Sequence, residues 1–253
     1  MANYQPKSLL ALALRAGEIM LKNGAETYRV EDIIDRLIKA GNIKEVSSFV
    51  IPTGIFVSLT DTDGKVITRV LRINERTINL DKIAAINDFT RNFTETPCDL
   101  VESFNRLNQI DQEKLKYGRF IRIIGAGIIS SSSAILFGGP LANFAPAFIT
   151  GSLVQLGSQL LMKRKLPLFF RDAFGGALAA LSSLLITHLG FGLNPGNIIL
   201  GTIMPLVPGV AITNALRDAM HGDLIASTGR AMEAFLSALA IAAGVALVLS
   251  FWY

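Results

Sequence analysis

The sequence predicts an α+β cytoplasmic domain over residues 1–118, followed by an all-α membrane domain of about five transmembrane helices over residues 119–253. Three observations predict this division. Most of the 24 basic and 20 acidic residues lie before Phe120, although 51% of the chain is hydrophobic. After Arg122, three long tracts contain no charged residue. Before residue 118, helical periodicity changes to strand-like alternation and back, which is typical of a small α+β fold.

Two amphipathic helices open the first domain. Apolar residues at helical spacing predict a helix over residues 9–21, which Asn23-Gly24 ends as a left-handed C-cap would. A second apolar stripe predicts a helix over residues 30–38, closed by Gly41. The short apolar run at residues 9–14 is followed by charged residues and by no cleavage site, which favours an amphipathic helix over a signal peptide.

A three-stranded meander follows these helices. Residues 46–51, 55–60 and 66–73 are rich in β-branched side chains. Turn-forming residues separate them at positions 52–54 and 61–64. The alternation and the turns together predict three consecutive antiparallel strands.

Two more helices complete this domain, over residues 80–93 and 100–115. Thr96-Pro97 separates them, and Asp99 is a candidate N-cap for the second. The predicted domain then ends just before the first uncharged tract.

The uncharged tracts predict the membrane-spanning helices, since a bilayer core requires about 20 apolar residues per crossing. The tracts cover residues 123–162, 173–216 and 234–253. The first two are long enough for two crossings each, with turns at 138–143 and 190–196 that contain glycine and proline. The five predicted crossings lie at about residues 119–137, 142–162, 170–189, 197–216 and 229–251.

Basic residues indicate the orientation of these crossings. The two glycine- and proline-containing turns have no charge, whereas the opposite helix ends carry Lys116, Arg119, Arg122, Lys163, Arg164, Lys165, Arg171, Arg217 and Arg230. Cytoplasmic loops collect lysine and arginine, so the N-terminus is predicted inside and the C-terminus outside. Trp252 and Tyr253 then fall at the outer interface, where aromatic residues concentrate.

Several functional classes lack their signatures in this chain. No phosphate-binding loop, HExxH zinc motif or nucleophile elbow is present. The two histidines, His188 and His221, both lie at predicted ends of membrane helices, which excludes a Ser-His-Asp triad in the soluble half. Cys98 is the single cysteine. The net charge of +4 is attributed mostly to the inside-positive loops, and the basic residues of the first half are interleaved with acidic ones, which argues against a nucleic-acid partner. We therefore expect no enzyme activity, no metal, no cofactor and no nucleic-acid partner.

One stretch of the soluble half is a candidate site. Glu26 and Thr27 fall near the apolar side of the second helix, and Arg29 is close enough to pair with a buried carboxylate. The structural alternative is a helix N-terminus at which acidic residues offset the dipole and Glu26 or Arg29 pairs locally.

A break in the fourth predicted crossing is the main candidate in the membrane half. Pro205, Pro208 and Gly209 lie near the centre of that span. Proline frees backbone groups that hydrocarbon cannot satisfy, and transporters use such discontinuous helices to hold small polar solutes. The alternative is a proline kink that packs against neighbouring helices.

Polar and charged residues follow the break. They are Asn214, Arg217 and Asp218 at the end of the fourth crossing, Asp223 in the next turn, and Arg230 and Glu233 at the start of the fifth crossing. Ionisable groups near a membrane core are costly and tend to face an interior or a water-filled path. Alternatively, the arginines anchor the topology and the acids neutralise them.

Small residues in two other crossings indicate helix packing. Ser130 to Ser133 lie in the first crossing, and the third contains glycines and alanines over residues 175–180. Such residues let helices approach closely, although the serine hydroxyls are also able to line a polar path.

The chain resembles the threonine/serine exporter family. The segments that carry the resemblance are Pro205-Leu-Val-Pro-Gly209, Asn214-Ala-Leu-Arg-Asp218, Gly222-Asp223, Gly229-Arg230, Glu233-Ala234, Gly24-Ala-Glu-Thr-Tyr-Arg-Val-Glu31 and Pro52-Thr-Gly54. They occur in the family's order over nearly the whole chain. The resemblance implies a multi-pass protein of the bacterial cytoplasmic membrane that exports threonine and serine, or a C4-dicarboxylate such as succinate in a two-subunit type.

The chain departs from the long, fused form of that family, which continues into a second hydrophobic unit. It is similar to the larger subunit of the split type, whose partner is a small integral membrane protein. Five crossings are also an awkward number for a pore built from paired repeats, so a second chain or a second copy is expected.

Three hypotheses follow. In the first, the chain is a subunit of a secondary exporter driven by the proton motive force: the break at Pro208-Gly209 opens the helix, Arg217 or Arg230 receives the solute carboxylate, and Asp218 carries the proton. In the second, it is a membrane-anchored sensor or regulatory module with a ligand-binding cytoplasmic domain. The third, a cytoplasm-facing enzyme, has no recognisable catalytic motif. Threonine, serine and succinate all present carboxylates, so the sequence leaves the solute open.

Overall fold

The computed structural model describes residues 4–43, 45–61, 63–96, 98–114, 116–161 and 167–253. The chain forms two compact units. The first comprises residues 1–115 and 210–231, and the second comprises residues 116–209 and 232–253. Pro97 and the basic run 163–165 lie outside the described residues. Which side of a membrane each predicted domain occupies stays a prediction.

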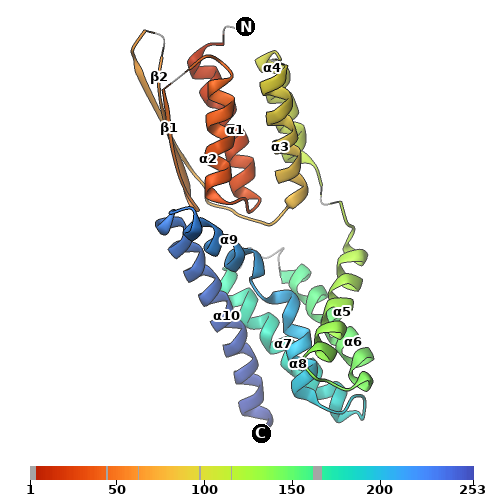
Figure 1. Ribbon diagram of the computed structural model, residues 1–253. Coiled ribbons are helices and arrows are strands. Elements are labelled where there is room, and N and C mark those ends of the chain that lie inside the picture. Colours follow the sequence, from red (N-terminus) through yellow and green to blue (C-terminus); the bar gives the residue numbers. More distant parts are fainter. Residues whose placement is uncertain (1–3, 44, 62, 97, 115, 162–166) are drawn as a thin grey trace. The chain divides into compact units, whose positions relative to one another are not determined.

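The first unit contains the predicted helices and strands of the N-terminal half (Figure 1). They are α1 (Pro6–Lys22), α2 (Thr27–Lys39), β1 (Val46–Ile51), β2 (Gly54–Thr60), β3 (Val66–Arg72), α3 (Leu80–Glu95) and α4 (Leu100–Gln112). The antiparallel sheet has the order β1-β2-β3. The pair α1 and α2 lies between this sheet and the pair α3 and α4, so the unit has three layers.

Local sequence accounts for the ends of these elements. Gly24 has a φ of 92° after the C-cap of α1, which confirms the predicted left-handed turn. At the end of α2 the left-handed residue is Asn42, with a φ of 64°, rather than the predicted Gly41. Asparagine tolerates this conformation because its short polar side chain bonds locally. Asp99 caps α4 as predicted, by accepting a hydrogen bond from the Val101 N–H.

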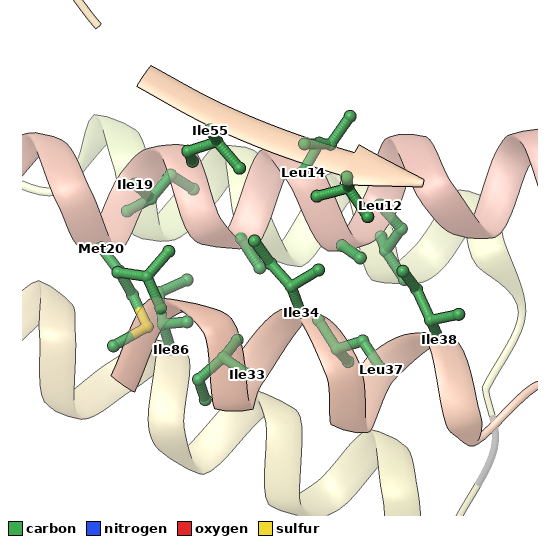
Figure 2. Close-up of a cluster of buried hydrophobic side chains, with 14 of the residues drawn as sticks. Leu12, Leu14, Ile19, Met20, Ile33, Ile34, Leu37, Ile38, Ile55 and Ile86 are labelled. Carbon is green, nitrogen blue, oxygen red and sulfur yellow. The ribbon is translucent and has the colours of Figure 1, made fainter. Parts of the chain in front are cut away.

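The core of the first unit consists of large aliphatic side chains. Figure 2 shows a part of it, in which α1 and α2 interdigitate beneath Ile55 of β2 and beside Ile86 of α3. Leu12, Ile34 and Leu37 are fully buried. A Cβ added to Gly17 would lie 2.8 Å from Ile34 Cδ1, so α1 and α2 approach closely at this glycine. The predicted apolar stripes of the two helices therefore face each other.

Helices make up the second unit. They are α5 (Arg119–Leu136), η1 (Leu141–Asn143), α6 (Phe144–Leu161), α7 (Leu168–His188), α8 (Pro195–Ile203), η3 (Met204–Leu206) and the later part of α10 (Leu224–Trp252). The remaining helix, α9 (Gly209–Met220), belongs almost entirely to the first unit. The five predicted crossings fall on these helices, and the fourth is interrupted between η3 and α9.

Small residues bring the helices of the second unit together. Ser130 of α5 packs directly against Gly151 of α6, where an added Cβ would collide with the serine hydroxyl. Ser131 Oγ lies 2.9 Å from the carbonyl oxygens of both Gly127 and Phe144, which share its single hydroxyl proton. These contacts favour the packing interpretation for these two serines, because both side chains lie against backbone atoms or against a closely packed neighbouring helix.

Three described helices are long and apolar enough to cross a membrane: α5, α7 and α10. The bent pair formed by α8 with η3 and by α9 would be a fourth if it is one span. The helix of the second predicted crossing, α6, is not among these candidates. It contains Gln155 and Gln159, and its described residues end at Leu161. The described part of the chain thus has three or four candidate spans.

A buried asparagine connects the two turns that the sequence placed on one side of the helices. The Asn143 Oδ1 accepts a hydrogen bond of 2.9 Å from the Leu193 N–H, and its Nδ2 donates to the Asn194 carbonyl at 3.2 Å. Asn197 adds a bond of 2.8 Å to the Phe137 carbonyl. These side chains satisfy backbone groups that the turns leave unpaired.

Candidate functional site

The turn between α1 and α2 exposes backbone groups that side chains of α9 and α10 satisfy. The Gly24 carbonyl accepts a hydrogen bond of 2.8 Å from Asn214 Nδ2, and the Ala25 carbonyl accepts one of 2.6 Å from Arg230 Nη2. Both donors are nearly fully buried. A buried carbonyl without a partner is costly, so these two contacts define where α9 and α10 meet the turn.

Asp218 caps α2 from a distant part of the chain. Its Oδ1 accepts hydrogen bonds from the Thr27 N–H at 3.2 Å and from Thr27 Oγ1 at 2.9 Å. Thr27 is the first residue of α2, and the preceding residue, Glu26, does not cap the helix with its own side chain. The carboxylate therefore takes the place of an N-cap side chain and faces the positive end of the helix dipole.

Asp223 lies beside the same threonine. Its Oδ2 is 3.3 Å from Thr27 Oγ1, which is farther than the Asp218 oxygen. A hydroxyl has one proton to donate, so Thr27 favours the nearer carboxylate. The Asp223 N–H also bonds to the Asp218 carbonyl at 2.9 Å, which closes the turn between α9 and α10.

Arg230 neutralises the buried charge of Asp218. Its Nε lies 2.9 Å from Asp218 Oδ2, and the two side chains are 7% and 0% exposed. A buried ion pair of this kind adds little net stability, but removing one partner leaves an uncompensated buried charge. Asp218 and Arg230 thus depend on each other within the first unit.

Glu26 is a second buried carboxylate in this region. It pairs with Arg217 of α9 and, at 3.3 Å, with Arg29 of its own helix. Burial alone would raise the pKa of Glu26, but hydrogen bonds from backbone and from Arg217, with the charges of the two arginines, bring the pKa below its ordinary value. The predicted local pairing with Arg29 is present, and the longer-range partner Arg217 was not predicted.

Two further contacts surround these residues. The rings of Tyr28 and His221 stack with their centroids 3.8 Å apart. Glu31 accepts a hydrogen bond of 2.8 Å from the Val50 N–H. Burial, with the nearby carboxylates of Asp223, Asp35 and Asp218, raises the pKa of Glu31 despite that bond. These contacts carry no local sequence signal, because their partners are separated along the chain.

We call this group of residues the polar cluster. It consists of Glu26, Thr27, Asn214, Arg217, Asp218, Asp223 and Arg230, with Arg29 at its edge. All of them belong to the first unit. The polar cluster unites the two sets of candidates that the sequence analysis kept apart, the soluble one and the membrane one.

The predicted break is present immediately before α9. Pro205 lies in η3, Val207 is extended with a ψ of 130°, and α9 begins at Gly209 after Pro208. The Gly209 N–H bonds to the Val207 carbonyl at 2.8 Å. Pro205, Pro208 and Gly209 belong to the second unit, as does Glu233. The rest of α9 belongs to the first unit. The structure therefore does not place those four residues in the polar cluster.

Helix α9 has an unusual distribution of polarity. Asn214 and Asp218 are buried, whereas Ile212, Leu216 and Met220 are exposed. A helix in water would expose its charged face and bury its apolar one. The reverse arrangement fits a helix with its polar face on protein and its apolar face toward lipid.

The described residues of the chain contain no group of three or more His, Cys, Asp or Glu side chains arranged to hold a metal ion. The polar cluster offers arginine donors, of which Arg217 has a half-exposed side chain, at 52%. Chemically, such a group binds carboxylates.

Comparison with known proteins agrees with this architecture. The family model described as "Putative threonine/serine exporter" (ThrE) matches residues 11–252. The chain belongs to the threonine/serine exporter family. It is therefore a membrane protein of a transporter family and not an enzyme.

Curated relatives of this exporter-family chain fall into two length classes. A "Threonine/serine exporter" of Corynebacterium glutamicum is 25% identical over 252 residues, covering 96% of this chain and 51% of the relative. A "Probable threonine/serine exporter" of Mycobacterium tuberculosis is 22% identical over 244 residues, covering 96% and 46%. The chain thus spans about half the length of these relatives.

A third relative is matched over nearly its whole length. The "Probable succinate transporter subunit YjjP" of Escherichia coli K12 is 25% identical over 255 residues, covering 100% of this chain and 98% of the relative. The printed name of that protein implies that it works with another subunit. No solved structure matches the chain.

Proposed function

We propose that the chain is one subunit of a secondary exporter of small carboxylate-bearing metabolites, driven by the proton motive force. The observation that carries the proposal is the match over essentially the full length of a succinate transporter subunit, combined with the match over half of the threonine/serine exporters. On this basis the solute is threonine or serine, or a C4-dicarboxylate such as succinate. A small integral membrane partner would complete the transporter, with further copies forming an oligomer.

The proposal includes a membrane topology. The chain would lie in the cytoplasmic membrane of a bacterium, with residues 1–118 inside and the C-terminus outside. Five crossings satisfy the alternation of basic helix ends, with α6 as the second and the bent pair α8 and α9 as the fourth. The exposed apolar face of α9 supports its assignment to a span.

Within this transporter, the break at Pro205, Pro208 and Gly209 would open the solute path, because it frees backbone groups where a continuous helix has none. Arg217 is the best-placed solute ligand of the polar cluster, since its guanidinium is half exposed and already holds a carboxylate, that of Glu26. A solute carboxylate would replace Glu26 in that pair.

The remaining charged residues have a different role in the proposal. Asp218 and Arg230 neutralise each other and hold the turn before α2. The prediction that Asp218 carries the coupling proton stays a prediction, and Glu233 remains a candidate of the pathway on α10. Measuring pH-driven efflux by an Asp218→Asn variant, with its partner present, tests the proton role: unchanged efflux would exclude it.

Transport by inverted membrane vesicles tests the proposed function itself. Vesicles containing the chain and its small partner should accumulate labelled threonine, serine or succinate when a proton gradient is applied, and vesicles with either subunit alone should not. Arg217→Gln should lower uptake by reducing affinity for the solute, whereas Arg217→Lys should restore part of it. Tight binding of a metabolite by the purified chain, without flux in any combination of subunits, would favour the sensor alternative instead.

A further inference from the structure

A buried carboxylate in the second unit has no place in the function described so far. Asp172 lies in the second turn of α7 and is 8% exposed. Its Oδ2 accepts a hydrogen bond of 2.5 Å from Ser237 Oγ of α10. An ionisable side chain inside a candidate membrane span is costly, and such residues generally serve an ion or substrate path.

The two helices that enclose Asp172 are in backbone contact. A Cβ on Gly176, one turn after Asp172, would collide with the Ile241 carbonyl of α10. A Cβ on Gly244 would collide in turn with the Ala173 carbonyl of α7. These glycines hold the Asp172–Ser237 pair between two closely packed helices.

The charged groups near this pair are few. Arg171 precedes Asp172 on α7, and Glu233 lies one turn before Ser237 on α10. Where α7 meets η3, the contact at Gly175 is with Leu206, which has no titratable group. Among the described residues, no lysine, arginine or histidine forms an ion pair with Asp172. Its recorded polar partner is a neutral hydroxyl, whereas Asp218 has Arg230.

Ser237 is able to form a hydrogen bond with Asp172 in either protonation state of the carboxyl group. Its hydroxyl donates to the ionised carboxylate, and its oxygen is able to accept from the protonated acid. The charge of Arg171 acts on the Asp172 carboxylate and favours its ionised form. Burial without a counter-ion in contact favours the uptake of a proton. The same step at Asp218 would leave the charge of Arg230 buried without a partner.

We propose that Asp172 binds the proton that drives export and that Ser237 positions it. The carboxylate takes up one proton from the outer side and releases it to the inner side as one solute molecule moves outward, so Asp172 ends each cycle in the protonation state in which it began. The inference rests on the proposed export function.

Proteoliposomes with the chain and its partner subunit test this role in two transport modes. In the first, a pH gradient drives net accumulation of labelled threonine, serine or succinate, whichever the wild type carries. In the second, labelled solute exchanges for unlabelled solute at equal pH, and no net proton movement is needed. Asp172→Asn should reduce the rate of pH-driven accumulation at least tenfold. Its rate of solute exchange should stay within about threefold of the wild type. Driven accumulation within twofold of the wild type would overturn the proposal, as would loss of both modes in a protein with a wild-type melting temperature.

A second variant keeps the carboxylate and removes its partner. Ser237→Ala should leave transport active and move the pH at half-maximal driven uptake upward by roughly half a unit or more, because one hydrogen bond to the ionised form is lost. An unchanged pH profile would overturn the proposal even if Asp172→Asn fails to fold. Ser182→Ala is the matched control on α7, since in the described part of the chain that hydroxyl bonds to carbonyls of its own helix, and it should leave both modes within twofold of the wild type.

Transport by the wild-type protein distinguishes failure of the proposed export function from failure of the Asp172 assignment. If it carries none of the three solutes in either mode, the proposed export function fails and this inference fails with it. If the wild type transports and Asp172→Asn remains fully proton-driven, only the assignment of Asp172 fails.

Discussion

The two units of the molecule bury opposite kinds of side chain. In the first, Leu9, Ile34 and Phe93 are at most 1% exposed, and most charges lie on the surface. In the second, many of the buried positions are small or polar, such as Ala179 and Ser183, while Phe120 is 79% exposed. In water, the hydrophobic effect drives large apolar side chains into the core. Lipid is as apolar as the protein interior, so this driving force is absent there and helix association depends on close backbone packing. The comparison shows that each unit is built for a different solvent.

Helix α9 sharpens this comparison. By its contacts it belongs to the first unit, but like the second unit it buries polar side chains and exposes large apolar ones. Its buried Asp218 is the position at which the two patterns of burial conflict most strongly. The four predictions below probe the difference between the units, from the largest expected effect to the smallest.

Asp218→Ala should produce the largest loss of stability. The change leaves Arg230 buried without its counter-ion and the Thr27 N–H without its cap, at a cost of about 3–5 kcal/mol. Denaturant unfolding of the purified chain in detergent micelles gives the free energy, and hydrogen exchange in the first turn of α2 locates it. The double variant with Arg230→Met should recover part of the loss. A cost below about 1 kcal/mol would mean that the ion pair is not buried in the folded protein.

Ile34→Ala tests the aliphatic core of the first unit. Removing a fully buried isoleucine at the contact of α1 and α2 should cost about 2–5 kcal/mol. The matched control in the second unit is Leu136→Ala, at a position 81% exposed, which should cost less than about 0.5 kcal/mol. The same unfolding measurement serves for both variants. Equal costs at the two positions would contradict the contrast between the units.

Gly176→Ala tests whether backbone contact decides the second unit. The added methyl group has no space against the Ile241 carbonyl, so α7 and α10 must separate, at a cost of about 1–3 kcal/mol. Gly125→Ala on α5 is the matched control, because a Cβ there meets no atom within 4 Å and alanine is the better helix former. Thermal melting in detergent compares them. A Gly176→Ala protein as stable as the control would show that α7 and α10 do not pack in this way.

The pH dependence of stability tests the smaller electrostatic contribution of Glu26. Its pKa is lowered in the folded protein, so the carboxylate stabilises the fold at neutral pH. That contribution is lost as the pH falls from the ordinary value of a glutamate, about 4.3, through the lowered one. Glu26→Gln should be less stable than the wild type at pH 7 by about 1 kcal/mol or less, and the difference should shrink toward pH 3. A difference that grows on acidification would contradict the direction of the shift.

Much of the fold could be predicted because its signals are local. Strand alternation, the capping residue Asp99 and the left-handed turn at Gly24 each depend on a few neighbouring residues. The break before α9 was also predictable, since proline removes a donor wherever it stands. The candidate residues of the polar cluster were singled out by their cost in an apolar context, but their partners were not.

The partners could not be predicted because they are long-range contacts. Thr27 and Asp218 are 191 positions apart, and Asp172 and Ser237 are 65 apart. Asp172 directly follows Arg171, so in the sequence it belongs to a charged helix end and gives no signal of burial. Only the packing of α7 on α10 shows that Asp172 is buried rather than part of an exposed helix end.

The sequence by itself determined the two solvents, the positions of the helices, the broken span and the exporter-family resemblance, because composition, periodicity and proline chemistry are properties of the chain alone. Only the tertiary structure decided that Asp218 has an arginine as its counter-ion and that Asp172 has a serine hydroxyl as its partner. The physical reason is that the state of a buried charge depends on the groups that face it, and those groups come from elements that the chain brings together only when it folds.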